Sequence, residues 1–318
     1  MTGGRMQMIR VTLKPVTPFG TPLLGEILFG QLCWAVHRLY GEDRLVELLG
    51  GYADGRPFAV LSDAMPEGFV PLPTLPNYLW QNDDGERRKY LKKKAWLLVD
   101  ALNDDPFTWQ ESACSDEEVC RSGLRAEEVV MHNTINRLSE TTATGRFAPF
   151  MKPQTWLNPN QPLSVYAVID ESRFTQEMLL DALTYVGQSG FGRDASVGLG
   201  KFELCEEVEK IEPKQACRTH VTLASSVLSA VPDLVEAETF YRTKTHFGRH
   251  GEVLALTGSP FKFPIMLATA GAVVTTKEPQ AFLTIGRGLS RVSIAQPEAV
   301  HQGYSPVLPL NGLDQDRN

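Results

Sequence analysis

The sequence predicts an α+β protein, and three patterns support that class. Short segments in which apolar and polar residues alternate indicate strands, and two longer segments with apolar residues at helical spacing indicate helices. In the first two thirds of the chain these segments follow one another as the outer elements of a β-α-β-β-α-β unit. From about residue 218 onward the sequence is rich in β-prone segments and has few good helices.

The unit begins with a strand and a helix. A strand is expected from residue 9, where Ile9, Val11 and Leu13 alternate with Arg10, Thr12 and Lys14, so that one face is basic. Residues 15–22 read as a turn region of Pro, Gly and Thr. An amphipathic helix is expected over residues 24–39, ending before Gly41.

The unit ends with a strand, a helix, a loop and a strand. Residues 163–169 alternate and predict a half-buried strand, and apolar residues at helical spacing predict a helix over 174–186. A glycine-rich loop at 187–200 then leads into a final strand at 201–204. The order is therefore strand, helix, glycine loop, strand.

The segment between these halves, about residues 50–160, is too long for simple connections and must be an insertion with its own contacts. It contains a basic run at 86–96, with six cations in nine residues and Tyr90 and Trp96 interleaved. This composition suits phosphate contacts with base stacking, and a solvated charged face is the alternative. Residues 132–145 are expected to form a mobile polar loop.

We expect two domains, at residues 9–212 and 213–312, because 318 residues suffice for two cores. Residues 1–8 are expected to be disordered or vector-derived, and residues 313–318 to be a tail. Strands in the second domain are expected at 220–224, 239–244, 261–267 and 281–285, followed by an extended stretch at 305–310.

Five glycines lie within the fourteen residues of the loop at 187–200. Glycine permits φ > 0 and a close approach of backbone N–H groups to a ligand, and Arg193 and Lys201 add charge, so the loop suits phosphate. A dinucleotide fingerprint needs the loop before a helix, and a P-loop needs Ser or Thr where Phe202 stands, so both nucleotide sites are excluded. A plain helix-to-strand connection is the alternative.

The composition is that of a soluble globular protein, with 42% hydrophobic and 22% charged residues. No apolar run reaches the ~18–20 residues that span a bilayer and no signal peptide is visible, so a cytoplasmic protein without membrane contact is expected. The net charge of −7 argues against a free-standing nonspecific nucleic-acid binder but permits a local basic groove. The acidic clusters could face basic partner subunits.

The five cysteines are odd in number and widely spaced. Cys114 and Cys120 have only His132 nearby as a third ligand, which is weak support for zinc. We therefore expect reduced thiols, no metal and no cofactor.

Seven segments, taken in order, carry a resemblance to a known family. The most specific is Gly192-Arg193-Asp194-Ala195-Ser196-Val197-Gly198-Leu199-Gly200-Lys201-Phe202, and the others are residues 28–35, 57–66 with 71–73, 92–96, 132–137, 260–264 and 301–304. Together they resemble the RAMP superfamily of CRISPR-associated RNA-binding proteins. Within it they are similar to the Cas-five group subunit that caps the crRNA 5′ handle in type III effector complexes (the fourth Csm-type subunit).

This resemblance implies two ferredoxin-like (RRM-like) domains, with the long insertion in the first. It implies a noncatalytic subunit of a type III CRISPR-Cas ribonucleoprotein for antiviral defence. The subunit would bind and cap the crRNA 5′ handle and anchor the large polymerase-like subunit to the adjacent RAMP backbone subunit. The implied RNA-binding residues are Gly190, Gly192, Arg193, Ser196, Gly198, Gly200 and Lys201 in the loop, Asn133, Asn136 and Arg137 in the insertion, and Arg249, Lys262 and Arg287 in the second domain.

Two other functions stay open. Some RAMP proteins are metal-independent endoribonucleases with a His general base, and His37 on the first helix could take that role, although the rim of an amphipathic helix is an ordinary place for a histidine. Lys244, His246 and His250 form a second group, for which phosphate contact is favoured over catalysis. The third possibility is a purely structural subunit whose glycine loops pack against protein.

Overall fold

The computed structural model describes residues 6–76, 89–142, 145–212, 216–251 and 260–314. Its first sheet has the strand order β2-β8-β1-β9, and all of these neighbours are antiparallel. The strands are β1 (Met6–Pro15), β2 (Ala59–Leu61), β8 (Leu163–Asp170) and β9 (Phe202–Ile211), with β3 (Met65–Pro66) paired to the start of β8.

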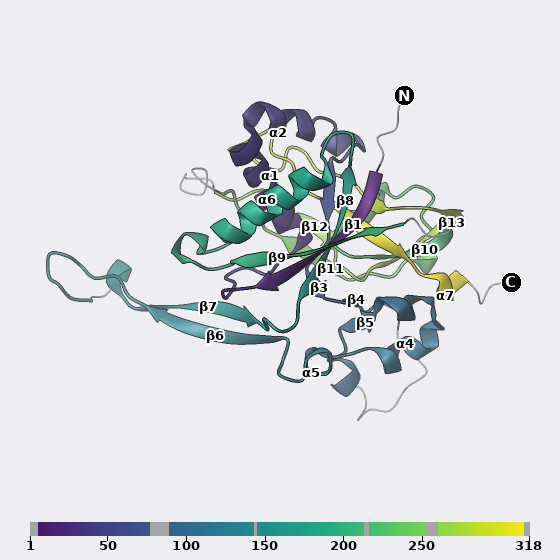
Figure 1. The fold of residues 1–318 in the computed structure, drawn as a ribbon, viewed down its shortest axis with the longest axis horizontal. Coiled ribbons are helices and arrows are strands. Elements are labelled where there is room, and N and C mark those ends of the chain that lie inside the picture. The colour runs from purple at the N-terminus through teal and green to yellow at the C-terminus, as the bar shows by residue number, and fades with distance from the viewer. Residues whose placement is uncertain (1–5, 77–88, 143–144, 213–215, 252–259, 315–318) are drawn as a thin grey trace.

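Two helices complete a β-α-β-β-α-β order along the chain (Figure 1). They are α1 (Gly25–Tyr40), which α2 (Glu42–Leu49) follows, and α6 (Gln176–Ser189). α1 and α6 lie against each other over the sheet, and the Tyr40 hydroxyl donates to Asp181 at 3.0 Å. The mixed α+β class predicted from the sequence is therefore confirmed.

The ends of the helices follow from local chemistry. α6 begins at Thr175, whose hydroxyl accepts from the Met178 N–H, and ends at Gly190, where φ is 95°. α1 has no side-chain cap from the residue before it. Instead Asp63, far along the chain, accepts the Gly25 N–H at 2.8 Å. The N-terminus of α1 is thus capped by the partly buried side chain of Asp63.

Two expectations about the first sheet were wrong. β1 begins at Met6 rather than Ile9, because residues 6–8 continue the pairing with β8 and Met8 is buried. β8 is buried along its whole length rather than half-buried, since side chains of the second sheet, including Val221 and Leu308, belong to the same apolar cluster. A central strand covered on both faces has no solvent side that would require polar residues.

The second sheet has the antiparallel order β13-β10-β15-β14. Its strands are β10 (Cys217–Thr222), β13 (Val273–Gln280), β14 (Thr284–Gly286) and β15 (Tyr304–Pro309). The expected extended stretch near the end of the chain is thus an internal strand of this sheet. The short helix α7 (Asn311–Asp314) follows it.

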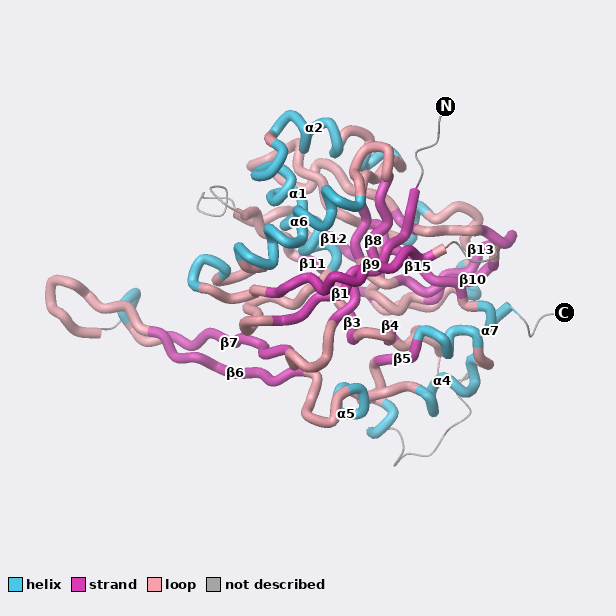
Figure 2. Tube along the Cα trace, in the orientation of Figure 1, coloured by secondary structure: helices cyan, strands magenta, loops and turns pink. Residues whose placement is uncertain are grey.

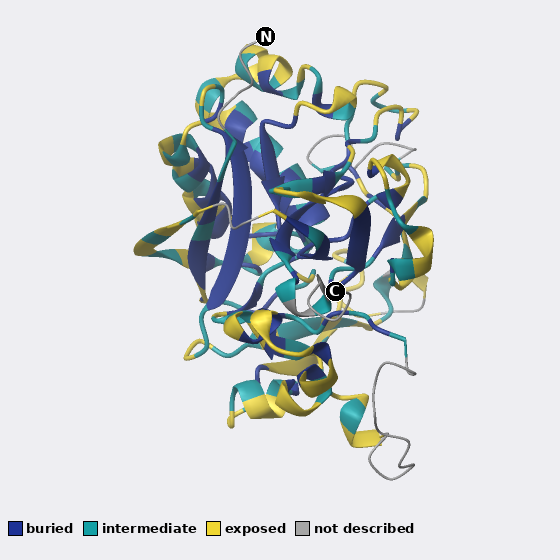
Figure 3. Ribbon diagram, turned by 90° about the vertical axis from the view of Figure 1, so that its right-hand side faces the viewer, coloured by how far each residue is buried: buried dark blue, intermediate teal, exposed yellow. Residues whose placement is uncertain are grey.

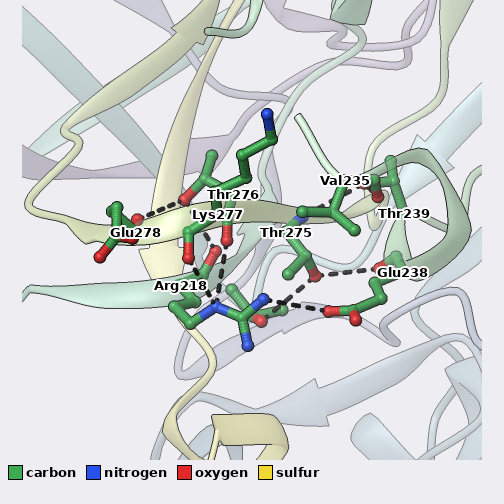
Figure 4. Close-up of polar contacts among 9 residues, drawn as sticks. Arg218, Val235, Glu238, Thr239, Thr275, Thr276, Lys277 and Glu278 are labelled. Carbon is green, nitrogen blue, oxygen red and sulfur yellow. Dashed lines mark hydrogen bonds and ion pairs between the residues drawn. The ribbon is translucent and has the colours of Figure 1, made fainter. Parts of the chain in front are cut away.

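Polar contacts fasten the segment before β11 (Thr243–His246) to this sheet (Figure 4). Arg218 on β10 donates to the carbonyls of Thr276 and Lys277 and pairs with Glu238 at 3.4 Å. The Thr275 hydroxyl donates to the Glu238 carbonyl at 2.9 Å. These contacts hold a segment that contains 3₁₀ turns against β13, the edge strand of this sheet.

β11 pairs antiparallel with β12 (Ile265–Ala268), and we call the residues 243–250 and 260–268 the body ribbon. Figure 2 shows that this half of the molecule consists mainly of strands and loops. Among the described residues no α-helix lies between β10 and β15, and the strand order differs from that of the first sheet. The second ferredoxin-like domain therefore stays a prediction.

The insertion lies between β3 and β8 and has two parts. One is a small lobe with β4 (Phe69–Pro71), β5 (Trp96–Leu98), α4 (Pro106–Ser112) and α5 (Asp116–Val119). The other is a projecting hairpin of β6 (Arg125–His132) and β7 (Phe150–Leu157), which we call the arm (Figure 1). Buried residues concentrate in the two sheets, and the lobe is largely exposed (Figure 3).

One side chain connects the two sheets directly. Gln302 accepts the Leu61 N–H at 2.9 Å and donates to the Leu61 carbonyl at 2.7 Å, and it has no exposed surface. The Gln302 side chain therefore pairs with the N–H and C=O groups of Leu61, which point away from β8. Elsewhere, none of the described helices is both long enough and apolar enough to cross a membrane.

Candidate nucleic-acid interface

The glycine loop lies where the sequence predicted it, between α6 and β9, and its two ends are held together. The Phe191 N–H donates to the Gly200 carbonyl at 2.9 Å, and the Gly200 N–H donates to the Pro18 carbonyl at 2.8 Å. The backbone φ is 75° at Gly192 and 97° at Gly198, values that glycine adopts readily. The loop is thus a fixed structure packed against the turn at residues 18–21.

Close packing explains most of the glycines. A Cβ at Gly200 would lie 2.2 Å from the Phe191 carbonyl oxygen, one at Gly190 2.5 Å from the Leu199 oxygen, and one at Gly192 2.6 Å from the Thr21 Cβ. Gly198 differs, because a Cβ there meets nothing within 4 Å. Open space for a ligand against the backbone therefore exists at Gly198, beside the exposed Ser196.

Arg193 is engaged with the protein. Its Nε donates to the Gly20 carbonyl at 3.1 Å, a second guanidinium nitrogen donates to the Pro153 carbonyl on β7, and its N–H donates to Thr21 at 2.9 Å. The next residue, Asp194, forms an ion pair with Lys152 of β7 at 2.7 Å. Arg193 therefore fastens the loop to the base of the arm, a contact that the local sequence did not reveal.

Lys201 is the second cation of the loop, and it lies at the start of β9. Its backbone is bound on both sides: its N–H donates to the Thr17 hydroxyl at 2.9 Å, and its carbonyl accepts from Val16 and Thr17. The side chain is partly exposed. Among the predicted polar side chains of this loop, Ser196 and Lys201 thus reach solvent. The Arg193 side chain, in contrast, contacts the protein.

The structure separates the predicted insertion residues from this loop. Asn133, Asn136 and Arg137 lie in the exposed segment between β6 and β7, at the far end of the arm from Pro153 (Figure 1). Asn136 makes a local turn, in which its side-chain oxygen accepts the Leu138 N–H at 3.0 Å. These residues and the glycine loop can contact the same RNA only if it extends along the arm.

The second-domain residues fall in two places. Arg249 and Lys262 lie on the paired strands of the body ribbon, where the Lys262 N–H donates to the Gly248 carbonyl at 2.8 Å. Arg249 is exposed, whereas burial lowers the pKa of Lys262. Arg287 is exposed in the turn after β14. The predicted basic track is thus divided between the ribbon and a separate turn.

The side chains of Lys244, His246 and His250 face the inside of the molecule. The prediction that this group contacts phosphate is therefore wrong. Lys244 pairs with Glu26 of α1 at 2.7 Å, and His246 Nδ1 lies 3.7 Å from the same oxygen. The Glu26 side chain is completely buried. His250 is buried too, 2.6 Å from the Ser293 hydroxyl. The cluster joins the body ribbon to α1.

Burial and charge shift the titration of this cluster. Burial, and then the Glu26 carboxylate, raise the pKa of Asp63 to about 7, while the Gly25 N–H and Lys244 act in the opposite direction. Burial lowers the pKa of His246 despite Glu26 and lowers that of His301 to about 3. Glu26 and Asp63 were missed in the sequence; a lone acid within an apolar segment is the signal that could have found each.

His37 lies in the last turn of α1, with its ring edge-on to Trp34 at a centroid distance of 5.7 Å. In the described part of the chain no hydroxyl, carboxylate or second imidazole is hydrogen-bonded to it. A general base needs such a partner or a substrate pose to orient it. The surroundings of His37 are those of a helix-rim residue.

The basic run of the insertion is partly neutralised. Residues 86–88 lie outside the described residues, and Lys94, whose side chain is 4% exposed, pairs with Glu118 at 2.8 Å. Tyr90 donates to the same carboxylate at 2.6 Å, and Trp96 donates to Asp116 at 2.7 Å. Lys94, Tyr90 and Trp96 thus hold the lobe together, and the described cations of the run that are exposed to solvent are Lys89, Lys92 and Lys93.

The cysteines are free thiols in the structure. Cys120 lies beside Ser122 and Asn158, and Cys114 points to the Ser112 carbonyl. Within the described ranges no three His, Cys, Asp or Glu side chains are placed to share a metal ion.

No family model matches this chain, and no curated protein matches its sequence. Its fold does match solved structures. A chain in the crystal structure of a Csm1–Csm4 cassette in complex with cA4 has a TM-score of 0.59 at 17% identity, covering 95% of this chain and 97% of that one. A chain in the Csm3–Csm4 subcomplex of the type III-A CRISPR-Cas interference complex has a TM-score of 0.57 at 16% identity, covering 95% and 100%.

A Csm1–Csm4 cassette in complex with pppApA gives a TM-score of 0.58 at 16% identity over the same 95% of this chain. Csm4 is the subunit that all these assemblies share. The chain therefore has the fold of Csm4 over nearly its whole length.

Proposed function

We propose that this chain is a noncatalytic, Csm4-type subunit of a cytoplasmic type III CRISPR effector ribonucleoprotein, in which it binds and caps the 5′ handle of the crRNA. The observation that carries the proposal is the full-length match to the fold of Csm4, at both the first sheet and the second. We take the β-α-β-β-α-β unit as the first of the two ferredoxin-like domains that the resemblance implies.

The partners follow from the same comparison. Csm4 is found with Csm1 in one set of solved structures and with Csm3 in another. We infer that equivalents of these proteins, a large polymerase-like subunit and an adjacent backbone subunit, bind this chain. The net charge of −7 favours RNA binding inside such an assembly rather than by the chain alone.

In this proposal some residues of the glycine loop fix its position and others contact the RNA. Arg193 holds the loop against the base of the arm, whereas Ser196, Gly198 and Lys201 face the RNA. A phosphate or 2′-hydroxyl can approach the backbone at Gly198, and Lys201 supplies a cation beside it. A noncatalytic role is supported by His37, whose ring packs against Trp34.

The test uses a matched pair on one strand. Lys201→Glu reverses the charge beside the loop, and Lys210→Glu, at an exposed position further along β9, makes the same change away from it. Complexes assembled with guide RNA are treated with nuclease and the RNA 5′ ends are sequenced. We expect Lys201→Glu to lose the protected handle and Lys210→Glu to keep it.

Equal protection in both variants would contradict the assignment of the loop. The endoribonuclease alternative is tested separately, by incubating the purified chain with repeat RNA. Cleavage that His37→Ala abolishes would overturn the noncatalytic proposal.

A further inference from the structure

The outer face of the body ribbon carries exposed aromatic side chains that packing does not explain. Phe247 and Phe261 are 67% and 63% exposed, and Phe263 is also exposed. Residues two apart on a strand point the same way, and Arg249 and Phe261 form a bridge pair, so these side chains share one face. Large apolar side chains gathered on a surface mark an interaction site.

The opposite face of the same ribbon is fixed to the protein core. Lys244 and His246 contact the buried Glu26, and His250 contacts Ser293. Each strand therefore alternates between side chains that anchor it to α1 and side chains that are presented to solvent. The exposed rings stand on a rigid support, which reduces the entropy lost when they bind.

Charge identifies the class of ligand. Within residues 241–251 and 260–268, which contain no Asp or Glu, the exposed cations are Arg242 and Arg249, whereas Lys244 pairs with the buried Glu26 and Lys262 is partly buried. The Arg249 guanidinium lies 5.9 Å from the centre of the Phe261 ring. Cations interleaved with exposed rings are what proteins use to bind single-stranded nucleic acid, by stacking bases and contacting phosphates.

The ribbon is also connected to the candidate interface already described. The glycine loop is bound to Gly20 and Thr21, and the ribbon is bound to Glu26, five residues further on. Both surfaces therefore flank the start of α1. RNA that leaves the loop has a nearby second surface of suitable chemistry.

We propose that the outer face of the body ribbon is a stacking platform for single-stranded RNA, on which Phe247, Phe261 and Phe263 contact bases and Arg249 contacts the backbone. The proposal rests on the proposed function, because it extends the RNA-binding surface beyond the glycine loop.

The test removes the rings and keeps apolar bulk. In the double variant Phe247→Leu with Phe261→Leu, binding of the full chain to fluorescein-labelled oligouridylate of about 15 nucleotides is measured by anisotropy at low salt. Loss of two stacked bases should weaken binding at least about tenfold. The control is Phe107→Leu, an exposed ring on α4 of the small lobe, which should leave the Kd unchanged. Equal affinities of wild type and double variant would overturn the proposal.

A second measurement separates this proposal from the proposed function. In the assembled complex, guide RNA carrying 4-thiouridine is photo-cross-linked, and the modified peptides are identified by mass spectrometry. Cross-links at Phe247, Phe261 or Phe263 support the platform. A protected 5′ handle without such cross-links keeps the proposed function and overturns the platform, whereas a complex that contains no guide RNA overturns the proposed function.

A protein partner is the remaining outcome. If the double variant binds oligouridylate as wild type does but no longer assembles with the large subunit in the absence of RNA, the ribbon is a protein-docking surface and the stacking proposal is wrong.

Discussion

The arm and the body ribbon are both antiparallel two-stranded ribbons with exposed apolar side chains, yet they differ in what lies behind them. The arm has solvent on both faces along most of β6, and it is attached through β7, by Arg193, Lys152 and the backbone hydrogen bonds between Thr155 and Phe19. The body ribbon lies on α1 and is fixed along one face by a buried ion pair. An isolated two-stranded ribbon is at best marginally stable in water, so the arm depends on its attachment.

Their charges differ as well. The arm carries Glu127 and Glu128, and Glu128 accepts from Trp156 at 2.7 Å and from Gln154 at 2.9 Å. The described residues of the body ribbon include no Asp or Glu, and the acid that pairs with Lys244 comes from α1. The comparison indicates that burial of one face fixes the conformation of a ribbon, while the exposed face is free to be specialised for a ligand.

The largest expected effect is on protein stability, and it distinguishes the ion pair that attaches the body ribbon from the one that attaches the arm. Lys244→Met leaves the Glu26 carboxylate buried without its nearest cation, and we expect the free energy of unfolding to fall by about 3 kcal/mol. Lys152→Met removes the corresponding ion pair at the base of the arm, where the lysine side chain is 33% exposed, and should change it by less than about 1 kcal/mol. Urea denaturation of both variants measures the difference. Equal losses would show that the two ribbons are anchored alike.

The next effect depends on pH. The pKa of Asp63 is about 7 in the folded protein against an ordinary 3.8, so its protonation adds stability at low pH that is lost as the pH rises through 7. Asp63→Asn carries no charge and its oxygen can still accept from Gly25. We therefore expect the variant to gain stability over wild type as the pH is raised from about 5 to about 8.

The measurement is the difference in melting temperature between Asp63→Asn and wild type across that range. His301, with a pKa lowered to about 3, acts in the opposite sense, since its contribution is lost as the pH falls. Because both proteins contain His301, its contribution cancels in the difference. A difference that stays constant with pH would contradict the assignment to Asp63.

The smallest effect is expected on the arm. Met131 and Met151 face each other across β6 and β7 and are 72% and 69% exposed. The double change Met131→Ser with Met151→Ser should alter the free energy of unfolding by no more than about 0.5 kcal/mol, because little burial is lost. Hydrogen exchange of the β6 and β7 amides checks that the arm keeps its structure. A large loss of stability would mean that these side chains are packed.

The first sheet and its helices could be predicted because their residues repeat with a clear period and end at glycines. Gly41 marks the end of α1, as the sequence indicated, whereas α6 continues through Gly187 to Ser189, beyond the predicted end at residue 186. The arm could not be predicted in the same way. Most β6 side chains are exposed on both faces, so the Glu-Glu-Val-Val run at 127–130 shows no alternation. β15 was expected only as an extended stretch at 305–310, and Pro306 and Pro309 lack an N–H, but the Pro306 carbonyl accepts from Leu223 at 3.0 Å.

The position of the glycine loop could be predicted from the sequence, but the roles of its residues could be predicted only in part. The loop lies between helix and strand as expected, but the partners of Arg193, Gly20 and Pro153, are distant in the sequence and cannot be read from a local pattern. The same holds for Lys244, whose partner Glu26 precedes it by 218 residues. Exposed Phe247 and Phe261 could have been noticed, since rings interleaved with cations are a visible signal.

The Gln302 contact has a consequence for how copies or partners can associate with the first sheet. A sheet edge with unpaired N–H and C=O groups is a template for another strand. At β2 the amide of Gln302 already occupies those of Leu61. At the opposite edge, β9 bears the exposed carboxylates Glu203, Glu206, Glu207 and Glu209, which repel a second copy of themselves. Both edges thus oppose the addition of a further strand, which disfavours growth of the sheet from molecule to molecule.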